Sequence, residues 1–263
     1  MVVAFGIVEV ATAIMRAEPS HRSEQVSELL FGEKCIIFEE NKDDWLFIRS
    51  EWDHYDGWIK KSQILYINEK EYSKSNKFLS ISKNDLLFNE QEEISLSPGS
   101  NLFQLQGRQF KWQKPIPYKF KGKKLDFQNN TFKASTLLDY CLLFLGTPYV
   151  WGGRSIHGID CSGLSQILYK LFNIKIPRDA SQQAQKGKTI HFLMESQIGD
   201  LAFFDNEEGK INHVGILLDQ NTIIHATDTA GKVVVDKIDN GGIISVKKKQ
   251  RTHKLRLIKR YVE

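Results

Sequence analysis

The spacing of apolar residues changes near residue 131, and this change limits what the chain can fold into. Before that point, apolar residues fall in short alternating runs, which are typical of β-strands. After it, two stretches carry apolar residues at helical spacing, and several strand-like runs follow. Helices followed by antiparallel strands predict an α+β domain, with all-β modules ahead of it.

The part before residue 131 divides into two predicted modules. Residues 1–66 hold closely spaced strand patterns such as KCIIFEE and DWLFIRS, and they predict a small all-β barrel. Residues 67–125 repeat this pattern more weakly after the polar stretch EYSKSNKFLS, and they predict a second, reduced module. The polar stretch at 121–130 is interpreted as a linker, and residues 126–263 form the third predicted domain.

Two apolar stripes predict helices in this third domain. The first, in STLLDYCLLFL, would begin with Ser135 as its N-cap and end at Gly146. The second, in SGLSQILYKLF, directly follows Cys161. The apolar residues of the two stripes are Leu137, Leu138, Cys141, Leu142 and Leu145, and then Leu164, Ile167, Leu168, Leu171 and Phe172.

Composition is that of a globular protein, with 41% apolar and 26% charged residues and a net charge of +4. The densest basic run, KKKQRTHKLRLIKR, has no interleaved aromatic residues. We therefore interpret it as a solvated strand pair and expect no nucleic acid partner. The mildly basic balance could still favour an anionic substrate or polymer.

The first twenty residues do not match a secretory signal. Glu9 interrupts the apolar stretch, and no Lys or Arg precedes it. No segment approaches 18 consecutive apolar residues. We expect a cytoplasmic protein without a membrane partner, or a periplasmic or secreted one if a signal has been removed.

The three cysteines differ in their surroundings. Cys35 and Cys141 lie inside apolar runs and are expected to pack in the core. The odd count and the lack of a CxxC pair argue against a disulfide framework and a zinc ribbon. Cys161, in GIDCSGL, could be a buried small residue, a metal ligand, a redox thiol or a nucleophile.

The position of Cys161 just before a helical stripe favours the nucleophile. The positive end of the helix lowers the pKa of a thiol placed there. Gly158 and Gly163 would let a carbonyl substrate approach the backbone, and N–H groups at the helix start could stabilise an oxyanion. A buried structural cysteine is the alternative.

Two histidines are candidates for the base that such a thiol needs. His213 and His225 lie on consecutive strand patterns, with a turn near Gln220 and Asn221, so antiparallel pairing would bring them close on one face. His213 could then act as base and His225 could orient it. A structural role is the alternative for either. Zinc binding by Cys161, His213 and His225 fits the DCSG context less well than catalysis, so no metal or cofactor is expected.

Several motifs together carry a family resemblance. LGTPYVWGGRSIHGIDCSGL, IPRDASQQ, GDLAFF, HVGILL and IIHAT occur in an order that resembles the NlpC/P60 family of papain-like cysteine peptidases, over residues 131–245. The stretch WLFIRS followed by YDGWI resembles bacterial SH3 (SH3b) domains. The implied fold is a papain-like NlpC/P60 catalytic domain preceded by small SH3b barrels. The family typically cleaves cell-wall peptides between D-γ-glutamyl and a diamino acid.

The resemblance also implies roles for single residues. Cys161 would be the nucleophile, His213 the base and His225 the third, orienting residue. Tyr149 would help to hold the oxyanion. Three further positions are implied near the cleft: Asp160 and Ser162 as contacts to the substrate peptide, and Trp151 as part of the cleft wall, with packing under the glycines as the alternative for Trp151.

The order of domains resembles γ-D-glutamyl-L-diamino-acid endopeptidases that act on released murein peptides with a free N-terminal L-Ala. An ammonium group in a closed pocket needs carboxylate partners. Asp179 matches the acid of the catalytic domain. The SH3b acid is expected to be Glu24, with Glu28 as its rival, and Tyr55 matches the SH3b tyrosine.

Some features stay open at this stage. Ala180 stands where the subgroup often has serine, so one substrate hydrogen bond could be missing. We expect a monomer, and the sequence does not select the diamino acid. The alternatives are a peptidoglycan-tethered wall hydrolase and a non-catalytic wall-binding protein.

Overall fold

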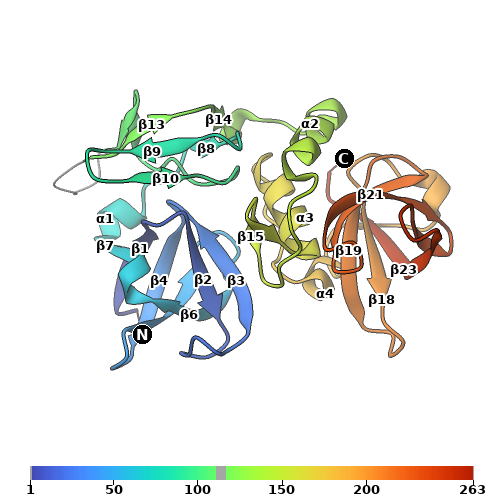
Figure 1. Ribbon diagram of the computed structural model, residues 1–263, viewed down its shortest axis with the longest axis horizontal. Coiled ribbons are helices and arrows are strands. Elements are labelled where there is room, and N and C mark those ends of the chain that lie inside the picture. Colours follow the sequence, from blue (N-terminus) through green and yellow to red (C-terminus); the bar gives the residue numbers. More distant parts are fainter. Residues whose placement is uncertain (1, 111–116, 263) are drawn as a thin grey trace. The chain divides into compact units, whose positions relative to one another are not determined.

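The computed structural model describes residues 2–110 and 117–262, and the chain forms two compact units. The first unit is Met1–Asn130 with Lys170–Lys175, and the second is Thr131–Tyr169 with Ile176–Glu263. Each unit has its own sheets (Figure 1). The division into three domains remains a prediction.

The first unit begins with an antiparallel sheet that has seven strands within residues 2–110, in the order β3-β2-β6-β5-β4-β1-β7. The runs KCIIFEE and DWLFIRS form β4 and β5, as predicted, whereas β3 was not expected from its mixed sequence QVSELL. A short helix, α1 (Glu69–Tyr72), follows the sheet. The strands are β1 (Ala4–Val8), β2 (Thr12–Arg16), β3 (Gln25–Leu30), β4 (Lys34–Glu40), β5 (Trp45–Ser50), β6 (Asp56–Lys60) and β7 (Ile64–Ile67).

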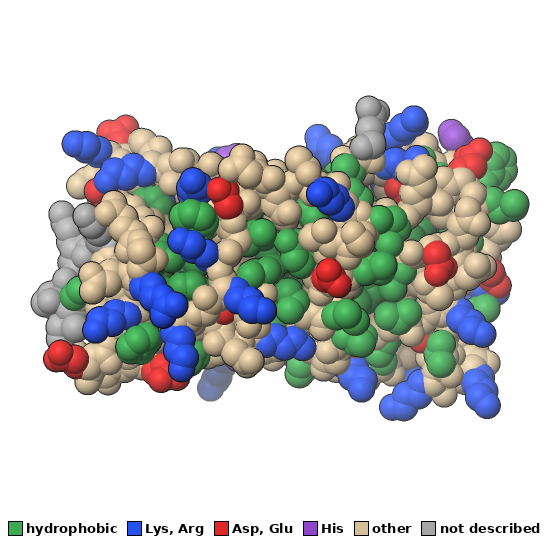
Figure 2. Space-filling model, turned by 90° about the horizontal axis from the view of Figure 1, so that it is seen from above, with side chains coloured by type: hydrophobic (Ala, Val, Ile, Leu, Met, Phe, Trp, Pro, Cys, Tyr) green, Lys and Arg blue, Asp and Glu red, His purple; other side chains and the backbone are tan. Residues whose placement is uncertain are grey.

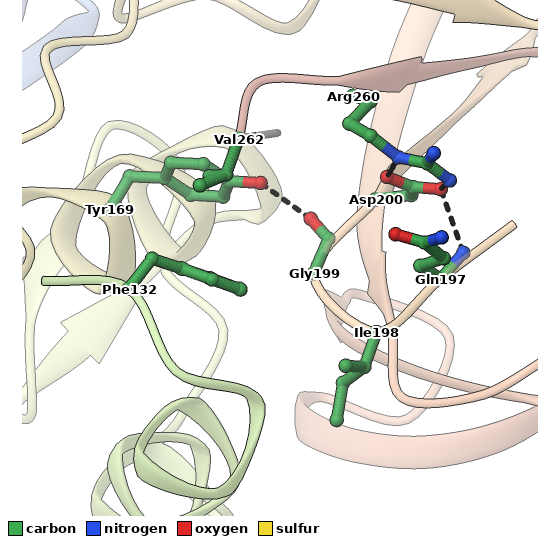
Figure 3. A pocket seen from close by; sticks show the side chains of 8 residues that line it. All are labelled: Phe132, Tyr169, Gln197, Ile198, Gly199, Asp200, Arg260 and Val262. Atoms are coloured by element: carbon green, nitrogen blue, oxygen red, sulfur yellow. Dashed lines mark hydrogen bonds and ion pairs between the residues drawn. The ribbon is translucent and has the colours of Figure 1, made fainter.

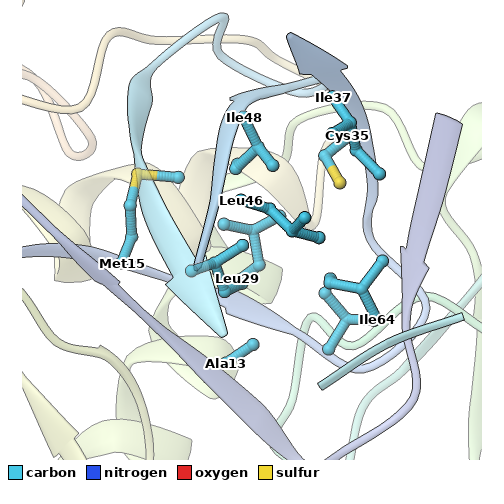
Figure 4. Close-up of a cluster of buried hydrophobic side chains, with 10 residues drawn as sticks. Ala13, Met15, Leu29, Cys35, Ile37, Leu46, Ile48 and Ile64 are labelled. Carbon is cyan, nitrogen blue, oxygen red and sulfur yellow. The ribbon is translucent and has the colours of Figure 1, made fainter. Parts of the chain in front are cut away.

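Alternating residues of this sheet build an apolar core. The cluster takes side chains from all seven strands of the sheet, and Figure 4 shows members of it, among them Leu29, Leu46 and Ile48, gathered between the strands. Cys35 belongs to this cluster and is fully buried, which confirms its predicted packing role. Burial raises the pKa of the Cys35 thiol to about 12, so this cysteine stays protonated at neutral pH.

A second sheet and a strand pair complete the first unit. The sheet order is β10-β9-β13-β12-β11 among the described residues, and β14 pairs with β8. The interpretation of residues 121–130 as a linker was wrong, because part of this polar stretch pairs as β14 and Phe127 is buried. Residues 111–116 of the second predicted module lie outside the described residues. The strands are β8 (Phe78–Ser80), β9 (Leu86–Phe88), β10 (Glu93–Ser95), β11 (Leu105–Gln106), β12 (Gln109–Phe110), β13 (Lys119–Lys121) and β14 (Lys124–Asp126).

The second unit starts with helices. In α2 (Ala134–Phe144) the N-cap is Lys133, so the predicted cap at Ser135 was wrong. The predicted stripe was also partly wrong: the buried residues of α2 are Leu137, Tyr140, Cys141 and Phe144, whereas Leu138, Leu142 and Leu145 are exposed. By contrast, every residue of the second predicted stripe, in and just after α3 (Cys161–Lys170), is buried.

The strands of the second unit close into a barrel. Within residues 117–262, the order β17-β23-β18-β19-β20-β21-β22 is completed by pairing of β22 with β23. The basic run near the C-terminus lies in β23 and the turn before it, rather than in the predicted strand pair. The strands are β17 (Lys188–Ile190), β18 (Leu201–Asp205), β19 (Ile211–Leu217), β20 (Thr222–Thr227), β21 (Lys232–Asp239), β22 (Gly242–Ser245) and β23 (Gln250–Arg260), with the short pair β15 (Arg154–Ser155) and β16 (Gly158–Ile159) before α3.

Two further properties complete the description. Over the described ranges, no helix is long and apolar enough to cross a membrane. Lys and Arg side chains are dispersed among apolar and other polar side chains on the face shown in Figure 2.

Candidate active site

The barrel of the second unit carries a cluster of polar residues on its inner face. Side chains alternate between the two faces of a strand, so His213 shares a face with Leu217 in β19, and His225 shares one with Ile223 in β20. Leu217 and Ile223 belong to the barrel's apolar cluster. The two histidines therefore extend that cluster toward the other end of the same strands.

The predicted proximity of the two histidines is present. Nε2 of His213 lies 2.8 Å from Nδ1 of His225. Both side chains are buried, and His225 is completely enclosed. Gly215 provides room for this arrangement, because a Cβ there would lie 2.7 Å from Ile223 and 3.1 Å from the Cβ of His225.

Cys161 occupies the first turn of α3 and reaches the same strand. Its thiol forms hydrogen bonds with the backbone of Val214 and of Ser162. Val214 follows His213 directly in β19, so the thiol contacts the backbone next to the predicted base. The structure thus brings His213 and His225 together and places Cys161 against the backbone of the same strand, while the chemical roles of all three remain a prediction.

Tight backbone packing holds the cysteine loop. A Cβ on Gly163 would lie 2.2 Å from the carbonyl oxygen of Gly153, and one on Gly158 would lie 2.5 Å from the Val150 side chain. These glycines therefore allow neighbouring segments of the chain to pack closely, and the approach of a substrate carbonyl to them stays a prediction.

Asp160 and Ser162, predicted as substrate contacts, take part in a buried network. The Asp160 oxygens accept hydrogen bonds from the backbone N–H groups of Gly152 and Gly163, at 2.9 and 2.7 Å. Arg178 donates to both Asp160 oxygens, at 3.1 and 2.6 Å, and to the Ser162 hydroxyl at 2.8 Å. Substrate contact by these side chains stays a prediction, and the geometry assigns them to fixing the first turn of α3.

Arg178 was not identified from the sequence. Its side chain is almost fully buried, and it forms a two-point ion pair with Asp160. The sequence signal for Arg178 was its place in the PRDA motif. A buried arginine needs an anionic partner, so such a residue would have pointed to a nearby carboxylate.

Burial dominates the protonation of the candidate nucleophile. It raises the pKa of the Cys161 thiol to about 12, and the charge of Asp160 acts in the same direction. Hydrogen bonds from Val214 and Ser162 and the charge of Arg178 oppose this rise without cancelling it. The thiol is therefore protonated at neutral pH, contrary to the lowered pKa expected from the helix terminus alone.

The candidate base is neutral as well. Burial holds the pKa of His213 well below its usual value, and the neighbouring His225 and His253 lower it further. A neutral thiol beside a neutral imidazole can react only if the proton moves to the imidazole as sulfur attacks. The site is thus arranged for general-base activation rather than for a permanent thiolate.

Two further residues join the histidines and were missed in the sequence. His253 in β23 stacks on His213, with ring centroids 4.1 Å apart. Asp236 in β21 is buried, and one of its oxygens lies 3.2 Å from Nε2 of His225. The signal for Asp236 was a carboxylate on the inward-facing positions of the strand KVVVDKID, where Ile238 also lies.

Tyr149 and Trp151 lie in the loop before β15. Tyr149 is half-buried, and an isolated bridge pairs it with Ile159, two residues before Cys161. Burial and the nearby Cys161 and Asp160 raise the pKa of Tyr149, so its hydroxyl keeps its proton and can donate. Trp151 is 58% exposed, which agrees with a surface role and not with packing under the glycines.

The residues predicted for an amine pocket lie in both units. Asp179 is the partly buried N-cap residue of α4 (Ala180–Gln183), and Ala180 is buried. In the first unit, Glu24 is exposed before β3, whereas Glu28 is buried within it. Tyr55 packs against the core of that unit. A joint role of these residues in binding the substrate amine stays a prediction.

A separate cavity of about 80 Å³ lies at the other end of α3. Figure 3 shows Tyr169 directed at the Gly199 carbonyl, and Arg260 paired with Asp200. Tyr169 is eight residues beyond Cys161, which corresponds to about 12 Å along a helix. None of the predicted site residues lines this cavity.

Two family profiles match parts of the chain. Residues 146–252 match the profile of the NlpC/P60 family, and residues 15–64 match that of the bacterial dipeptidyl-peptidase Sh3 domain. Dipeptidyl-peptidase 6 of Lysinibacillus sphaericus is 27% identical over 257 residues, covering 89% of this chain and 91% of its own.

Two other proteins extend this comparison. The gamma-D-glutamyl-L-lysine dipeptidyl-peptidase of Bacillus subtilis is 29% identical over 226 residues, covering 80% of this chain and 74% of its own. The crystal structure of an NlpC/P60 family protein from Bacillus cereus superposes with a TM-score of 0.82 at 21% identity, covering 99% of this chain and all of that one. The latter likeness establishes the fold.

Proposed function

Because the chain carries an NlpC/P60 domain behind a bacterial SH3 domain, we propose that it is a cysteine peptidase with Cys161 as its nucleophile. One observation carries the proposal. The Cys161 thiol is hydrogen-bonded to the backbone of Val214, next to His213, and Nε2 of His213 lies 2.8 Å from Nδ1 of His225. A thiol, a base and an orienting group in this order suit covalent catalysis of acyl transfer.

The proposed substrate is a cell-wall peptide that is cut between a D-γ-glutamyl residue and an L-diamino acid. Two relatives that align over most of this chain are named gamma-D-glutamyl-L-lysine dipeptidyl-peptidase. Removal of a dipeptide requires a free N-terminus, which agrees with recognition of an N-terminal L-Ala. The product would be L-Ala-γ-D-Glu.

The reaction proceeds in two halves. His213 takes the thiol proton as the Cys161 sulfur attacks the γ-glutamyl carbonyl, and the oxyanion is held by N–H groups of the first turn of α3 and by the Tyr149 hydroxyl. His213 then protonates the departing amine, which leaves a thioester. Water, deprotonated by His213, attacks the thioester; the dipeptide departs and the thiol regains its proton.

The free amine of the substrate is proposed to select the peptides that bind. By the resemblance, Asp179 and one acid of the first unit, Glu24 or its rival Glu28, are the proposed partners of this charge, and Tyr55 is a further proposed contact. A buried ammonium group without such partners would be costly, so a blocked amine should bind poorly even if its volume fits.

Hydrolysis of L-Ala-γ-D-Glu-L-Lys and its diaminopimelate analogue by purified protein tests the reaction. We expect release of L-Ala-γ-D-Glu, and a loss of roughly 1,000-fold or more in Cys161→Ala. Cys35→Ala, which removes a buried thiol of the first unit, is the matched control and should keep its activity. Full activity in Cys161→Ala would overturn the proposed nucleophile.

The amine pocket is tested with the same peptides after N-acetylation. We expect acetylation to lower kcat/KM by roughly 100-fold, and Asp179→Asn to lower it for the free peptide only. Glu24→Gln and Glu28→Gln, compared side by side, identify the acid of the first unit. Equal cleavage of acetylated and free peptides would eliminate the pocket, and strong sedimentation with purified sacculi would favour a wall-tethered protein.

A further inference from the structure

The buried carboxylate of Asp236 is the part of the site that the reaction above leaves without a role. In the β20–β21 register Asp236 lies opposite Ile223, and His225 lies opposite Val234. Asp236 and His225 are therefore diagonal neighbours on the inner face of the barrel, within side-chain reach. Their closest atoms, Oδ2 and Nε2, are 3.2 Å apart.

The second oxygen of Asp236 fixes the carboxylate. Oδ1 accepts a hydrogen bond of 2.8 Å from the backbone N–H of Val246. Burial alone would raise the pKa of Asp236, but the hydrogen bonds from His225 and Val246 outweigh it and leave the pKa below its usual value. The group is ionised at neutral pH and can only accept hydrogen bonds.

Proton positions follow from this acceptor. Since Asp236 accepts, the His225 proton must be on Nε2, and Nδ1 of a neutral His225 is then an acceptor. That nitrogen lies 2.8 Å from Nε2 of His213, so His213 must donate from Nε2. The remaining nitrogen of His213, Nδ1, is left with a free electron pair.

The neighbouring ionisable groups do not disturb this order. His213 faces the cluster from β19, His225 from β20 and Asp236 from β21, while His253 faces it from β23. The pKa of His253 is lowered to about 4, first by burial and then by His225, with Asp228 and Asp236 acting in the opposite direction, so this ring is neutral at pH 7. Cys161, the first residue of α3, is protonated, and Asp160 directly before it raises its pKa further.

We propose that Asp236 is a positioning residue, which fixes the tautomer of His225 and through it leaves Nδ1 of His213 free to act as a base. This inference rests on the proposed peptidase function for its kinetic consequence. The proton order itself depends only on the contacts among Asp236, His225 and His213.

Asp236→Asn tests the proposal because asparagine keeps the shape and replaces one acceptor by a donor. The backbone N–H of Val246 can only donate a hydrogen bond. The amide oxygen of the introduced asparagine should therefore face it, which turns the NH₂ group toward His225. His225 would then carry its proton on Nδ1 and donate to His213. His213 would in turn hold its proton on Nδ1, where it cannot accept the thiol proton.

The expected kinetics distinguish tautomer control from simple packing. We expect Asp236→Asn to lower kcat by roughly 1,000-fold with KM within about threefold of wild type. Asp236→Ala removes the acceptor without imposing the wrong tautomer, so its kcat should fall less than that of Asp236→Asn. A purely structural role predicts the opposite order, since alanine leaves a cavity and a polar ring without a partner.

Asp239→Asn is the matched control. Asp239 lies on the same strand and pairs with Arg251 at the surface, so its substitution should leave kcat unchanged. Equal activity of Asp236→Asn and wild type, or a larger loss in Asp236→Ala than in Asp236→Asn, would overturn the proposal.

Nitrogen NMR of ¹⁵N-histidine-labelled protein gives a readout that needs no substrate. We expect His225 to be protonated on Nε2 in the wild type and on Nδ1 in Asp236→Asn. If no tested peptide is cleaved but these tautomers are found, the proposed function fails and the proton order stands. If His225 of the wild type is protonated on Nδ1, the proton order fails whether or not the variant folds.

Discussion

At the scale of single residues, the site combines groups that a sequence reveals with groups that it hides. Cys161, His213 and His225 lie in local patterns, a helix start and two consecutive strands, so the sequence could single them out and predict that the two histidines pair. Arg178 and Asp236 act through partners that only the packing and the β20–β21 register determine. The protonated state of Cys161 was also hidden, because it depends on burial.

The neutral thiol leads to a first prediction at this scale. Since the pKa of Cys161 is raised to about 12, its reaction with iodoacetamide at pH 7 should depend on His213. We expect His213→Asn to slow alkylation of Cys161 by roughly 100-fold, as measured by peptide mass spectrometry. His191→Asn, at an exposed position, should have no effect. An unchanged rate in His213→Asn would show that His213 does not take the proton.

The buried ion pair leads to a second prediction. Arg178→Gln would leave the Asp160 carboxylate buried without its partner, and we expect the free energy of unfolding to fall by about 3 to 5 kcal/mol. Arg251→Gln breaks an exposed pair with Asp239 and should lower the free energy of unfolding far less than Arg178→Gln does. Urea unfolding compares the two. Similar losses in both variants would contradict the special weight given to Arg178.

At the scale of elements, the buried face of a helix was predicted correctly for α3 and only partly for α2. The stripe of α3 is buried along its whole length, as the sequence indicated. In α2, Tyr140 and Phe144 are buried in place of Leu138 and Leu142, because contacts in the fold select the buried face. The short strands β17 and β22 carry little pattern of their own and form by pairing with β23.

The first turn of α3 gives a prediction about an element. Gly163→Ala would place a Cβ 2.2 Å from the Gly153 carbonyl oxygen, so we expect a loss of about 1 to 3 kcal/mol in stability together with reduced activity. Gly231→Ala is the comparison, since it has a φ of +71° but open space around it, and it should cost about 1 kcal/mol without an effect on kcat. Thermal unfolding and peptide hydrolysis measure both. Normal activity in Gly163→Ala would show that the turn tolerates the shift.

At the scale of the whole molecule, the order of strands, helices and strands was predictable from periodicity alone. Closure of the barrel was not, because it depends on pairing between β22 and β23, and neither the register nor the bulge between them leaves a pattern in the sequence. The fold comparison confirms the α+β class over the full chain.

The histidine cluster makes stability depend on pH. Folding holds the pKa of His253 near 4, below the value of about 6.5 that an unfolded chain would show. The unfolded state therefore binds more protons as pH falls below 6.5, and stability is lost progressively toward pH 4. We expect His253 to contribute a loss of about 1 to 2 kcal/mol between pH 7 and pH 5, with His213 acting in the same direction.

Urea unfolding at pH 7, 6 and 5 checks this dependence. Carboxylates lose their stabilising charge only at lower pH, so the change above pH 5 belongs to the histidines. His253→Asn should flatten the dependence, whereas the exposed His191→Asn should leave it unchanged. An identical slope in wild type and His253→Asn would contradict the assignment.

Closure of the barrel also ties chemistry to strand alignment. His213, His225 and Asp236 come from three consecutive strands, so each hydrogen bond of the series joins side chains of two neighbouring strands. A shift of one residue between β20 and β21 would turn Asp236 to the outer face while leaving every strand intact. The turn between β20 and β21, in which the Gly231 N–H donates to the Asp228 carbonyl, sets this alignment. Its length is therefore as important for activity as any side chain in the cluster. Insertions there should be far more damaging than insertions of equal length at the exposed Gly209 turn.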